Sequence, residues 1–396
     1  MAVAAVEGTV LFKEIFDDSY TERWIESTAK GADQGRFILS AGKHHHDPEA
    51  DKGIKTSEDG KFYGISSKID TTFSNKGKDL VVQFQAKHEQ NIDCGGGYIK
   101  LYPSGLEQTQ LDGETPYNIM FGPDICGSTK RVHVIFTYNG ENHLKKVDVP
   151  AKADEFAHLY TLVVHPDNTY EVLIDHESAA KGDIEEDWDI LEPKEIDDKD
   201  AVKPEDWDER AKIPDESDVK PANYDDITEF IVDETAEKPE DWDEDEDGEW
   251  EAPMIDNPEF RGPWVQKTID NLDYKGKWVR PKVANPEYKK DENLHAFEDN
   301  AFIGFDLWQV KSGTIFDNII VTDDLAEAEE FAKETFDLLR VGEKKMIDEA
   351  MAELKAKNEA SAADEEAVEE SAEEAVEESA EEAVEESAED VEEEEL

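Results

Sequence analysis

The sequence predicts a mainly β protein: a β-sandwich interrupted by an extended, proline-rich hairpin arm and followed by a helix and an acidic tail. Three observations lead to this prediction. Short runs rich in β-branched and aromatic residues, separated by turn residues, continue to about residue 176 and return after residue 300. Two families of internal repeats fill the interval between them. The spacing of apolar residues then becomes helical, and a glutamate-rich repeat ends the chain.

The globular part is predicted from its strands. In Arg131–Tyr138 the alternate residues Val132, Val134 and Phe136 are apolar, which is the pattern of a half-buried strand. Many short strands of this kind favour a sandwich. We predict strands at Val10–Phe16, Phe37–Ser40, Phe62–Ile69, Leu80–His88, Tyr98–Tyr102, Tyr117–Phe121, Arg131–Tyr138, Leu159–His165, Tyr170–Asp175, Ile303–Val310 and Thr314–Val321.

The repeats form the arm, residues 182–288. Proline excludes a helix there, and the many acidic residues leave little to bury. Three copies of each family predict a hairpin with its turn near Asp245–Trp250, in which rings from facing repeats form small cores. A disordered acidic linker is the alternative, but it does not explain the regular tryptophan spacing. The first family, Lys-Pro-Glu-Asp-Trp-Asp-Glu, occurs at Lys203–Glu209 and Lys238–Glu244, with partial copies at Lys220–Tyr224 and Glu186–Asp189; the second, Gly-x-Trp with a later Asn-x-x-aromatic, begins at Gly248, Gly262 and Gly276.

These motifs resemble the proline-rich domain of the calreticulin and calnexin family. The resemblance extends to Cys94–Tyr102, Tyr117–Cys126 and Leu307–Asp317, which are similar to the family's globular domain. It implies a concanavalin-like jelly roll interrupted by the arm. The implied parts are a globular domain in 7–181, the arm in 182–288, the rest of the globular domain with a helix in 289–358, and an acidic tail in 359–396. The two ends of the arm, near Lys181 and Lys289, must then lie close together.

The composition limits the partners. The net charge is -61, from 41 basic and 102 acidic residues, which argues against nucleic acid and anionic lipid and favours cations or basic surfaces. No apolar run reaches the length of a membrane span, so we expect a soluble monomer. Residues 1–6 look like the end of a trimmed secretory signal, and Glu393–Leu396 keeps only the last two residues of a Lys-Asp-Glu-Leu retention signal. The resemblance implies the endoplasmic reticulum lumen, and a weak retention signal would add surface or secreted pools.

The C-terminal segments follow two different patterns. From Asp324 to about Ala360 apolar residues recur at steps of three and four, which predicts a helix that packs its apolar stripe on the sandwich. Gly342 is expected to bend or break it. The segment Glu365–Ala388 repeats Glu-Glu-Ala-Val-Glu-Glu-Ser-Ala three times. We expect a mobile tail that binds calcium weakly and in large amount; a segment that only aids solubility is the alternative.

The sequence lacks the common enzyme signatures, and we expect a protein that is not an enzyme. The sequence contains no Gly-x-Ser-x-Gly, no phosphate-binding glycine loop and no His-Glu-x-x-His. The glycines Gly95–Gly97 precede a strand rather than a helix, so they do not form a dinucleotide loop. Acidic residues are too abundant for a glycosidase pair to be recognised. The cluster His44–His46 is more typical of an exposed loop than of a metal site.

A carbohydrate site is the strongest candidate. Tyr98 and Lys100 are two residues apart, so their side chains leave one face of a strand. Sugars are held by aromatic faces and by polar groups on their hydroxyls, although ordinary surface aromatics give the same pattern. The resemblance decides between them, because it implies that the matching positions bind the monoglucosylated arm of N-linked glycans. These positions are Tyr98, Lys100, Tyr117, Met120, Asp124, Ile135 and Asp306.

The resemblance implies three further features. Calcium would be held by the side chain of Asp317 and by the backbone carbonyls of Ile15, Ala50 and Lys52. Cys94 and Cys126, the two cysteines, would form a disulfide, with two free buried thiols as the alternative. The arm tip would dock a protein disulfide isomerase-like oxidoreductase through Asp245, Asp247, Glu249 and Trp250.

Together these features predict a calcium-binding lectin chaperone. It would bind monoglucosylated N-linked glycoproteins and unfolded polypeptides, recruit the oxidoreductase through the arm, and buffer calcium through the tail. Two other functions remain open. In a calcium-storage protein, substitution of Tyr98 would leave client folding unchanged. A glycan-independent holdase would protect a non-glycosylated client equally well.

Overall fold

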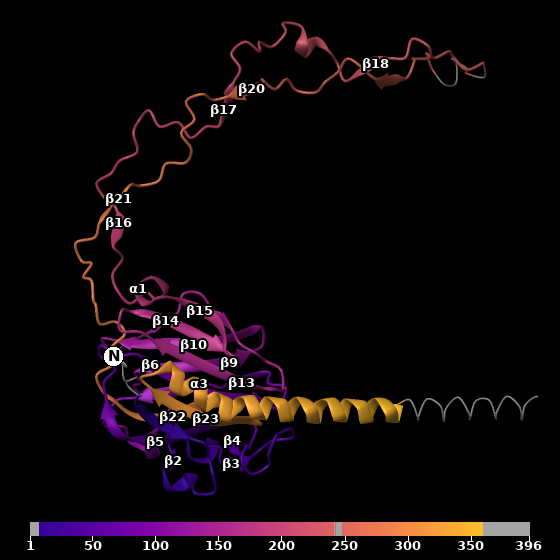
Figure 1. Ribbon diagram of the computed structural model, residues 1–396. Coiled ribbons are helices and arrows are strands. Elements are labelled where there is room, and N and C mark those ends of the chain that lie inside the picture. Colours follow the sequence, from indigo (N-terminus) through magenta and orange to yellow (C-terminus); the bar gives the residue numbers. More distant parts are fainter. Residues whose placement is uncertain (1–7, 241, 243–247, 359–396) are drawn as a thin grey trace, which may run out of the picture. The chain divides into compact units, whose positions relative to one another are not determined.

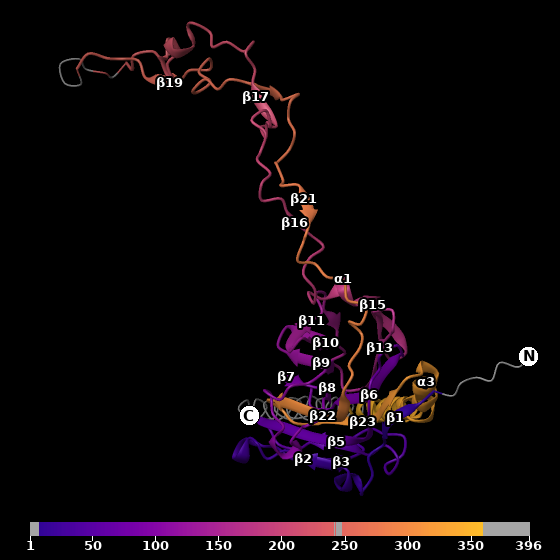
Figure 2. The ribbon, with the colours of Figure 1, turned by 90° about the vertical axis from the view of Figure 1, so that its left-hand side faces the viewer.

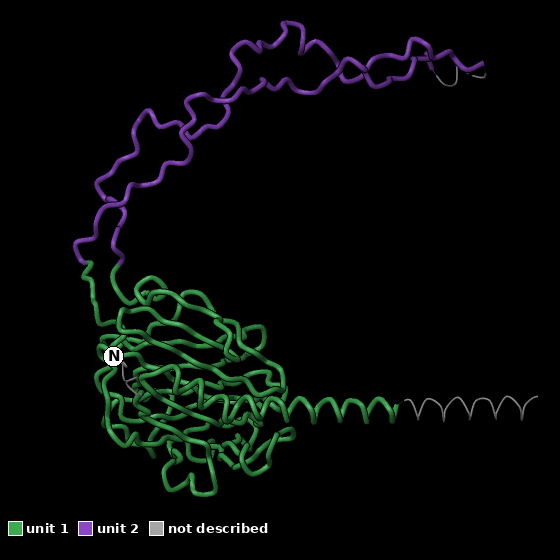
Figure 3. Tube along the Cα trace, in the orientation of Figure 1, with its two compact units in different colours: residues 1–192, 288–396 green, residues 193–287 purple. Residues whose placement is uncertain are grey.

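The computed structural model describes residues 8–240, 242 and 248–358, which divide into two compact units (Figure 3). The first unit contains the chain up to Glu192 and from Tyr288 onward, and the second is Pro193–Glu287. The arm therefore begins later than the predicted residue 182. Trp188, which we assigned to a repeat fragment, is a core residue of the first unit and is 1% exposed.

The first unit is built from two antiparallel sheets (Figures 1 and 2). The eight-stranded sheet has the order β15 (Glu177–Asp183), β14 (Thr169–Ile174), β13 (Ala157–Val164), β6 (Leu80–His88), β23 (Thr314–Thr322), β4 (Gly53–Thr56) and β3 (Phe37–Ser40), with β1 (Val10–Glu14) beside β23. The nine-stranded sheet has the order β11 (Glu141–Leu144), β10 (Thr129–Tyr138), β9 (Ile119–Cys126), β7 (Cys94–Gly96), β22 (Asn300–Gln309), β5 (Lys61–Phe73) and β2 (Trp24–Glu26). In that sheet β8 (Ile99–Tyr102) pairs with β9 and β22, and β12 (Val149–Pro150) pairs with β10.

All predicted strands of the sandwich are present; Phe37–Ser40 and Leu80–His88 have the predicted bounds, and the others have shifted ends. The strands that the sequence did not reveal, such as β4 and β7, are short and rich in glycine or charge. Short helices complete the unit: the 3-10 turns η1 (Tyr20–Glu22), η2 (Gly31–Asp33) and η3 (Gln108–Gln110), and α1 (Ile184–Asp187). The Asp183 side chain caps α1 by accepting a hydrogen bond from the Glu185 N–H.

Aromatic packing joins the two sheets. Phe84 of the eight-stranded sheet lies 5.9 Å from Phe121 and 6.3 Å from Phe305, ring centre to ring centre, and both of these belong to the nine-stranded sheet. Phe84 also stacks on Tyr160 of its own sheet at 5.8 Å. Such pairs add to the hydrophobic burial of the rings. Because side chains alternate along a strand, the residues between these core positions face away from the core.

A helix covers the outer face of the eight-stranded sheet. This helix, α3 (Leu325–Glu334), starts at Asp324, whose side chain accepts from the Ala326 N–H. Its Ala328 and Phe331 pack against Val81, Val163 and Ile320. The helix is interrupted at Thr335, and a second helical stretch covers 336–358. The predicted helix is therefore present.

The predicted break at Gly342 is wrong. Gly342 lies inside the second helical stretch, and a Cβ there would collide with the backbone of His46. The glycine lets the loop that carries His44–His46 approach the helix. Beyond it the apolar residues Ala350, Met351 and Leu354 are exposed, so the stripe packs on the sandwich only in its first part.

Buried ion pairs anchor the second helical stretch. The carboxylate of Glu343 is fully buried and lies 3.0 Å from the Lys87 ammonium on β6. Glu343 also pairs with Arg340 at 3.1 Å and accepts from the Ala157 N–H. Lys87 has a second carboxylate partner, Glu89, at 3.0 Å. These groups are desolvated, so removing one partner is costly.

The second unit consists of paired legs, as predicted. The described residues of this unit form three ladders: β16 (Glu195–Asp197) with β21 (Lys282–Ala284), β17 (Lys212–Pro214) with β20 (Thr268–Asp270), and β18 (Phe230–Val232) with β19 (Met254–Asp256); η4 (Tyr224–Asp226) precedes β18. Of the turn predicted near Asp245–Trp250, residues 245–247 lie outside the described residues.

Hydrogen bonds from side chains to the backbone of the facing leg recur along this unit. The amides of Asn257, Asn271 and Asn285 each donate to a carbonyl of the other leg, over 2.7–2.9 Å. The Trp207 indole N–H donates to the Gly276 carbonyl at 2.9 Å, and Lys275 lies over its ring. The Trp242 indole N–H likewise donates to the Gly248 carbonyl. We expected packed rings; the indoles of Trp207 and Trp242 instead donate hydrogen bonds to the backbone.

Replacing Glu343 by alanine tests the anchor. Lys87 and Arg340 would lose a buried partner, so we expect the free energy of unfolding to fall by about 3 kcal/mol. Urea unfolding monitored by circular dichroism measures it. Glu349→Ala, which removes a surface partner of Lys345, is the control and should cost less than about 1 kcal/mol. Equal effects of the two substitutions would contradict the anchor.

Candidate functional site

Residues predicted to bind sugar come together on the outer face of the nine-stranded sheet. Phe305 and Leu307 are in the core, so Asp306 between them faces outward. The same alternation places Lys100 outward from β8. In the strand register Lys100 lies opposite Met120, and Met120 lies opposite Ile135. Residues opposite each other on neighbouring strands share a face.

A buried ion pair lies at the centre of this face. The Lys100 ammonium is 2.8 Å from a carboxylate oxygen of Asp306, and the two side chains are 5% and 10% exposed. The ammonium also lies 4.8 Å from the ring centre of Tyr117 and 5.8 Å from that of Tyr98, within the range of cation–π attraction. The pair therefore fixes two polar groups between two aromatic rings.

Apolar side chains surround the ion pair. Tyr117, Met120 and Ile135 form one buried cluster with Tyr102 and Leu111, separate from the main core, and Tyr98 packs against it. Burial, reinforced by Asp306 and Asp124, raises the pKa of Tyr98. The phenol therefore keeps its proton at neutral pH and can donate a hydrogen bond.

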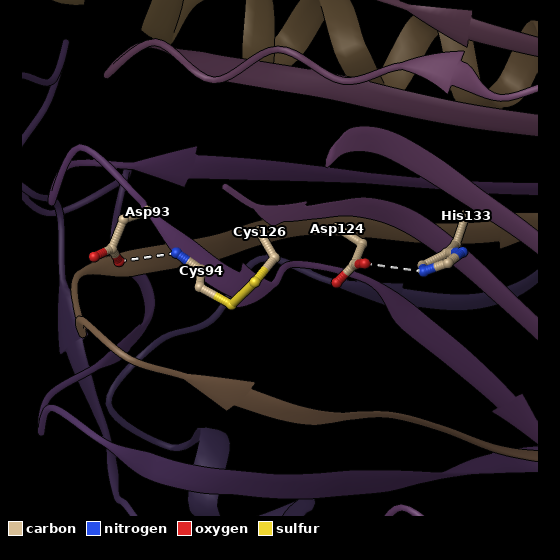
Figure 4. The surroundings of a disulfide bond; sticks show 5 residues. All are labelled: Asp93, Cys94, Asp124, Cys126 and His133. Atoms are coloured by element: carbon tan, nitrogen blue, oxygen red, sulfur yellow. Dashed lines mark hydrogen bonds and ion pairs between the residues drawn. A yellow bond between two sulfur atoms is a disulfide. The ribbon is translucent and has the colours of Figure 1, made fainter. Parts of the chain in front are cut away.

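The rim of the face is formed by Tyr98 and Asp124, which are partly exposed. Asp124 lies 3.1 Å from the Nε2 atom of His133, and the His133 ring meets the Tyr98 ring edge to face at 5.9 Å. Cys126 follows Asp124 by two residues on β9. It lies opposite Cys94 of β7, and the two cysteines form a disulfide (Figure 4). The predicted disulfide is confirmed.

Sequence reasoning missed four side chains on this face. Trp308, two residues after Asp306, lies opposite Phe62 in the strand register, and their ring centres are 4.7 Å apart. The Trp308 ring is 40% exposed. His133 and Tyr102 belong to the same face, and the Tyr102 hydroxyl is buried without a hydrogen-bond partner. The alternation Asp306-x-Trp308 was the signal that could have revealed the tryptophan.

Such a face is suited to binding a sugar. Aromatic rings cover the apolar C–H surface of a pyranose, while an ammonium and carboxylates meet its hydroxyls. The described face holds these groups already oriented, since the ion pair and the core packing restrict them.

The predicted calcium ligands lie on segments that converge at Asp317. Glu14, which precedes Ile15, pairs with Ile319 of β23. Gly53, which follows Lys52, is so close to β23 that a Cβ there would collide with the Phe316 carbonyl and crowd the Asp317 side chain. The loop that contains Ala50 leads into Gly53. The chain thus brings these loop ends to one buried carboxylate.

Asp317 fits a cation. Both of its carboxylate oxygens are buried and lack a hydrogen-bond partner. Burial raises the pKa of Asp317 well above its ordinary value, and Asp51 and Glu14 raise it further. A bound cation would satisfy these oxygens. Across the described part of the chain no group of three or more His, Cys, Asp or Glu side chains could hold a metal ion, so further ligands at Asp317 would have to include backbone carbonyls.

Other predicted features receive less definition. At the arm tip Glu249 is exposed and Trp250 partly exposed, whereas Asp245 and Asp247 lie outside the described residues. The His44–His46 loop contacts the second helical stretch: the His45 N–H donates to the Met346 sulfur, and Lys87 donates to the His44 carbonyl. The repeated tail, Glu365–Ala388, lies outside the described residues. Among the residues described, no helix is long and apolar enough to cross a membrane.

Comparisons with known proteins agree on one family. The model of the Calreticulin family matches residues 12–247 and 247–321. Calreticulin of Sus scrofa is 59% identical over 351 residues, which cover 88% of this chain and 84% of the relative; calreticulin of Bos taurus is 58% identical with the same coverage. Among solved structures, the T. cruzi calreticulin globular domain has a TM-score of 0.62 and 33% identity, covering 87% of this chain and 100% of that one.

Proposed function

This chain belongs to the Calreticulin family of lectin chaperones, and we propose that it binds monoglucosylated N-linked glycans on glycoproteins that fold in the endoplasmic reticulum lumen. The observation that carries the proposal is the Lys100–Asp306 pair, which is held between the rings of Tyr98 and Tyr117. It combines hydrogen-bonding groups and aromatic surface at one place, as recognition of a sugar ring requires.

Each side chain has a distinct part in this proposal. Lys100 donates to glucose hydroxyls, and Asp306 and Asp124 accept from them. Tyr98 and Tyr117 contact the apolar C–H surface of the ring. Met120 and Ile135 form the apolar floor beneath. The groups bind and orient the sugar without changing it, so the protein acts as a receptor and not as an enzyme.

Trp308 and Phe62 would extend the site to a second sugar. Their ring pair lies on the same face, and Trp308 follows Asp306 by two residues. Its exposed ring can stack on a mannose unit next to the glucose.

Calcium has a structural part in the proposal. Asp317 and the carbonyls of Ile15, Ala50 and Lys52 would hold one ion where β1, β4 and β23 meet. The ion would neutralise a carboxylate that has no other partner. The acidic tail would add weak, high-capacity calcium buffering.

The arm tip would recruit a protein disulfide isomerase-like oxidoreductase. Trp250 and Glu249, with Asp245 and Asp247, would meet a basic surface on this partner. Aromatic anchors of this kind carry much of the energy of an interface, while the charges speed association.

Two other functions compete with the lectin. The outer face around Lys100, Asp306, Tyr98 and Tyr117 is called the sugar face. A calcium-storage protein would bind calcium through Asp317 and the tail, and its sugar face would bind no glycan. A holdase would bind unfolded polypeptide without a glycan. The first rival predicts that substitutions on the sugar face have no effect on client folding.

Calorimetric titration of a monoglucosylated high-mannose oligosaccharide tests the lectin. Asp306→Ala removes an acceptor and leaves Lys100 buried without its carboxylate, which should cost at least about 2 kcal/mol, or roughly 30-fold in affinity. Glu298→Ala, which removes an exposed partner of Lys76, is the control and should bind normally. Equal binding of the unglucosylated oligosaccharide, or normal binding by Asp306→Ala, would refute the site.

Thermal unfolding with and without calcium tests the cation site. At calcium 100-fold above Kd the ion should stabilise the chain by about 2.7 kcal/mol. Asp317→Ala should lose this gain, yet unfold no earlier than the parent in excess chelator, because it also removes an unsatisfied buried carboxylate. If the variant gained as much from calcium as the parent, Asp317 would not be a ligand.

Surface plasmon resonance with a protein disulfide isomerase-like oxidoreductase tests the tip. Trp250→Ala should weaken binding by at least about tenfold, since it removes an aromatic anchor. Trp264→Ala changes the equivalent tryptophan of the next second-family repeat and should bind normally. Equal losses in the two variants would mean that the tip has no special part.

A further inference from the structure

The distal ladder of the arm, β18 with β19, exposes different side chains from the other two ladders. In each ladder the middle residues of the two strands are paired and apolar: Ile196 with Val283, Ile213 with Ile269, and Ile231 with Ile255. Opposite residues share one face. This apolar central pair is therefore common to the whole arm, and we assign it to holding the legs together.

The flanking residues form the opposite face of each ladder. In the first ladder this face includes Asp197 opposite Lys282, and in the second it includes Lys212 opposite Asp270. The remaining pairs of this face are Glu195 with Ala284 and Pro214 with Thr268, so each of these two faces carries one pair of opposite charges and no aromatic residue, Met, Leu, Ile or Val. Opposite charges across a ladder are favourable and keep the face soluble.

The distal ladder carries apolar side chains at these positions. Val232 lies opposite Met254, and Phe230 lies opposite Asp256. Phe230, Val232 and Met254 are 46%, 52% and 58% exposed. We call Phe230, Val232, Met254 and Asp256 the distal face. Because the other ladders pair with charged flanking residues, pairing of the legs does not require the apolar side chains here. Exposed apolar groups gathered at one place indicate a binding surface.

The charge around the distal face defines its partner. The described residues of this stretch, 221–240, 242 and 248–260, contain 11 acidic side chains and one basic side chain, Lys238. A second copy of the arm would be repelled by the same charge. A partner with basic side chains would be attracted. The surface therefore fits a ligand that is both apolar and cationic.

We propose that the distal face binds an extended polypeptide segment in which apolar and basic side chains alternate. The face is two strands wide, and Phe230 and Val232 lie two residues apart on one strand. In an extended segment the side chains on one side repeat at about the same spacing, roughly 6.5 Å. Its apolar side chains meet Phe230, Val232 and Met254. The basic side chains on its other side point away from the face and are attracted by the negative field of the acidic side chains around it, and Asp256 meets a basic group at the margin.

This proposal extends the proposed chaperone function. It rests on that function in one respect only, namely that the bound segment belongs to a client protein. It lies in a different unit from the sugar face. An unfolded glycoprotein would be held at two places, by its glycan and by an apolar, basic stretch of its chain. Binding of the segment does not require Asp306, so the two proposals can fail separately.

Fluorescence anisotropy with labelled peptides tests the distal face on the full chain. The probe is a peptide of alternating leucine and lysine; the comparison peptides alternate leucine with glutamate and serine with lysine. We expect binding of the first peptide alone. Substituting Phe230→Thr, Val232→Thr and Met254→Thr together should weaken it at least tenfold, and Asp306→Ala should leave it unchanged.

A matched control removes exposed apolar area elsewhere on the arm. Val265, Leu272 and Val279 are 80%, 98% and 75% exposed, and their combined change to threonine should leave binding unchanged. The set Phe230→Leu, Val232→Ile and Met254→Leu keeps an apolar face and should retain binding. Hydrogen exchange at the β18 and β19 amides shows whether the ladder remains intact in the threonine variant. If it does, weaker binding is due to loss of the apolar side chains and not to loss of the ladder.

Three outcomes would overturn the proposal. Equal losses in the distal and control triple variants would mean nonspecific attraction to apolar surface. Equal binding of the leucine–lysine and serine–lysine peptides would mean attraction to charge alone. If the distal triple variant kept the peptide but lost the oxidoreductase, the face would belong to that folded partner.

Discussion

The packing of Phe84 between the two sheets is the contact on which the sugar face depends. Phe84 meets Phe121 and Phe305, one on each of two strands that also carry site residues. A strand can turn Phe305 inward only if Asp306 points outward, and a slip of one residue would exchange them. The core therefore sets the register of the strands, and the register sets the positions of Asp306 and Lys100. The geometry of this candidate face is a consequence of aromatic packing on the opposite side of the sheet.

Two buried carboxylates on consecutive strands, Asp306 and Asp317, differ in whether a charged partner lies beside them. Asp306 has an ammonium 2.8 Å away, so its charge is balanced within the chain and remains available to a ligand. Asp317, on the next strand in sequence, has no hydrogen-bond partner at either oxygen. Isolated burial of a charge is costly, so this position favours either a proton or a cation. The difference between the two sites is the presence of one lysine.

Alternation along strands made much of the fold predictable, because apolar positions with a period of two identify both the strand and its buried face. The family resemblance supplied the candidate sugar-binding residues, and the structure places Lys100, Asp306, Met120 and Ile135 on one face. Local sequence could not place Trp188: it lies in a repeat-like motif, but its burial depends on Phe136 and Tyr170 from distant strands. Gly342 misled for a similar reason. The sequence showed that a glycine lowers helix stability at this position. It did not show that the backbone of His46 packs so closely against the helix that only glycine fits.

The arm depends on different forces, and this gives it a freedom that the sandwich lacks. Its legs are joined by hydrogen bonds repeated in each segment, such as those of Asn257, Asn271 and Asn285, and by one apolar pair in each ladder. Each segment of a repeat structure contacts only its nearest neighbours. The side chains on the face opposite the central apolar pair of one ladder can therefore change without disturbing the neighbouring ladders. For this reason the distal ladder can carry an apolar face where each of the others carries a pair of opposite charges.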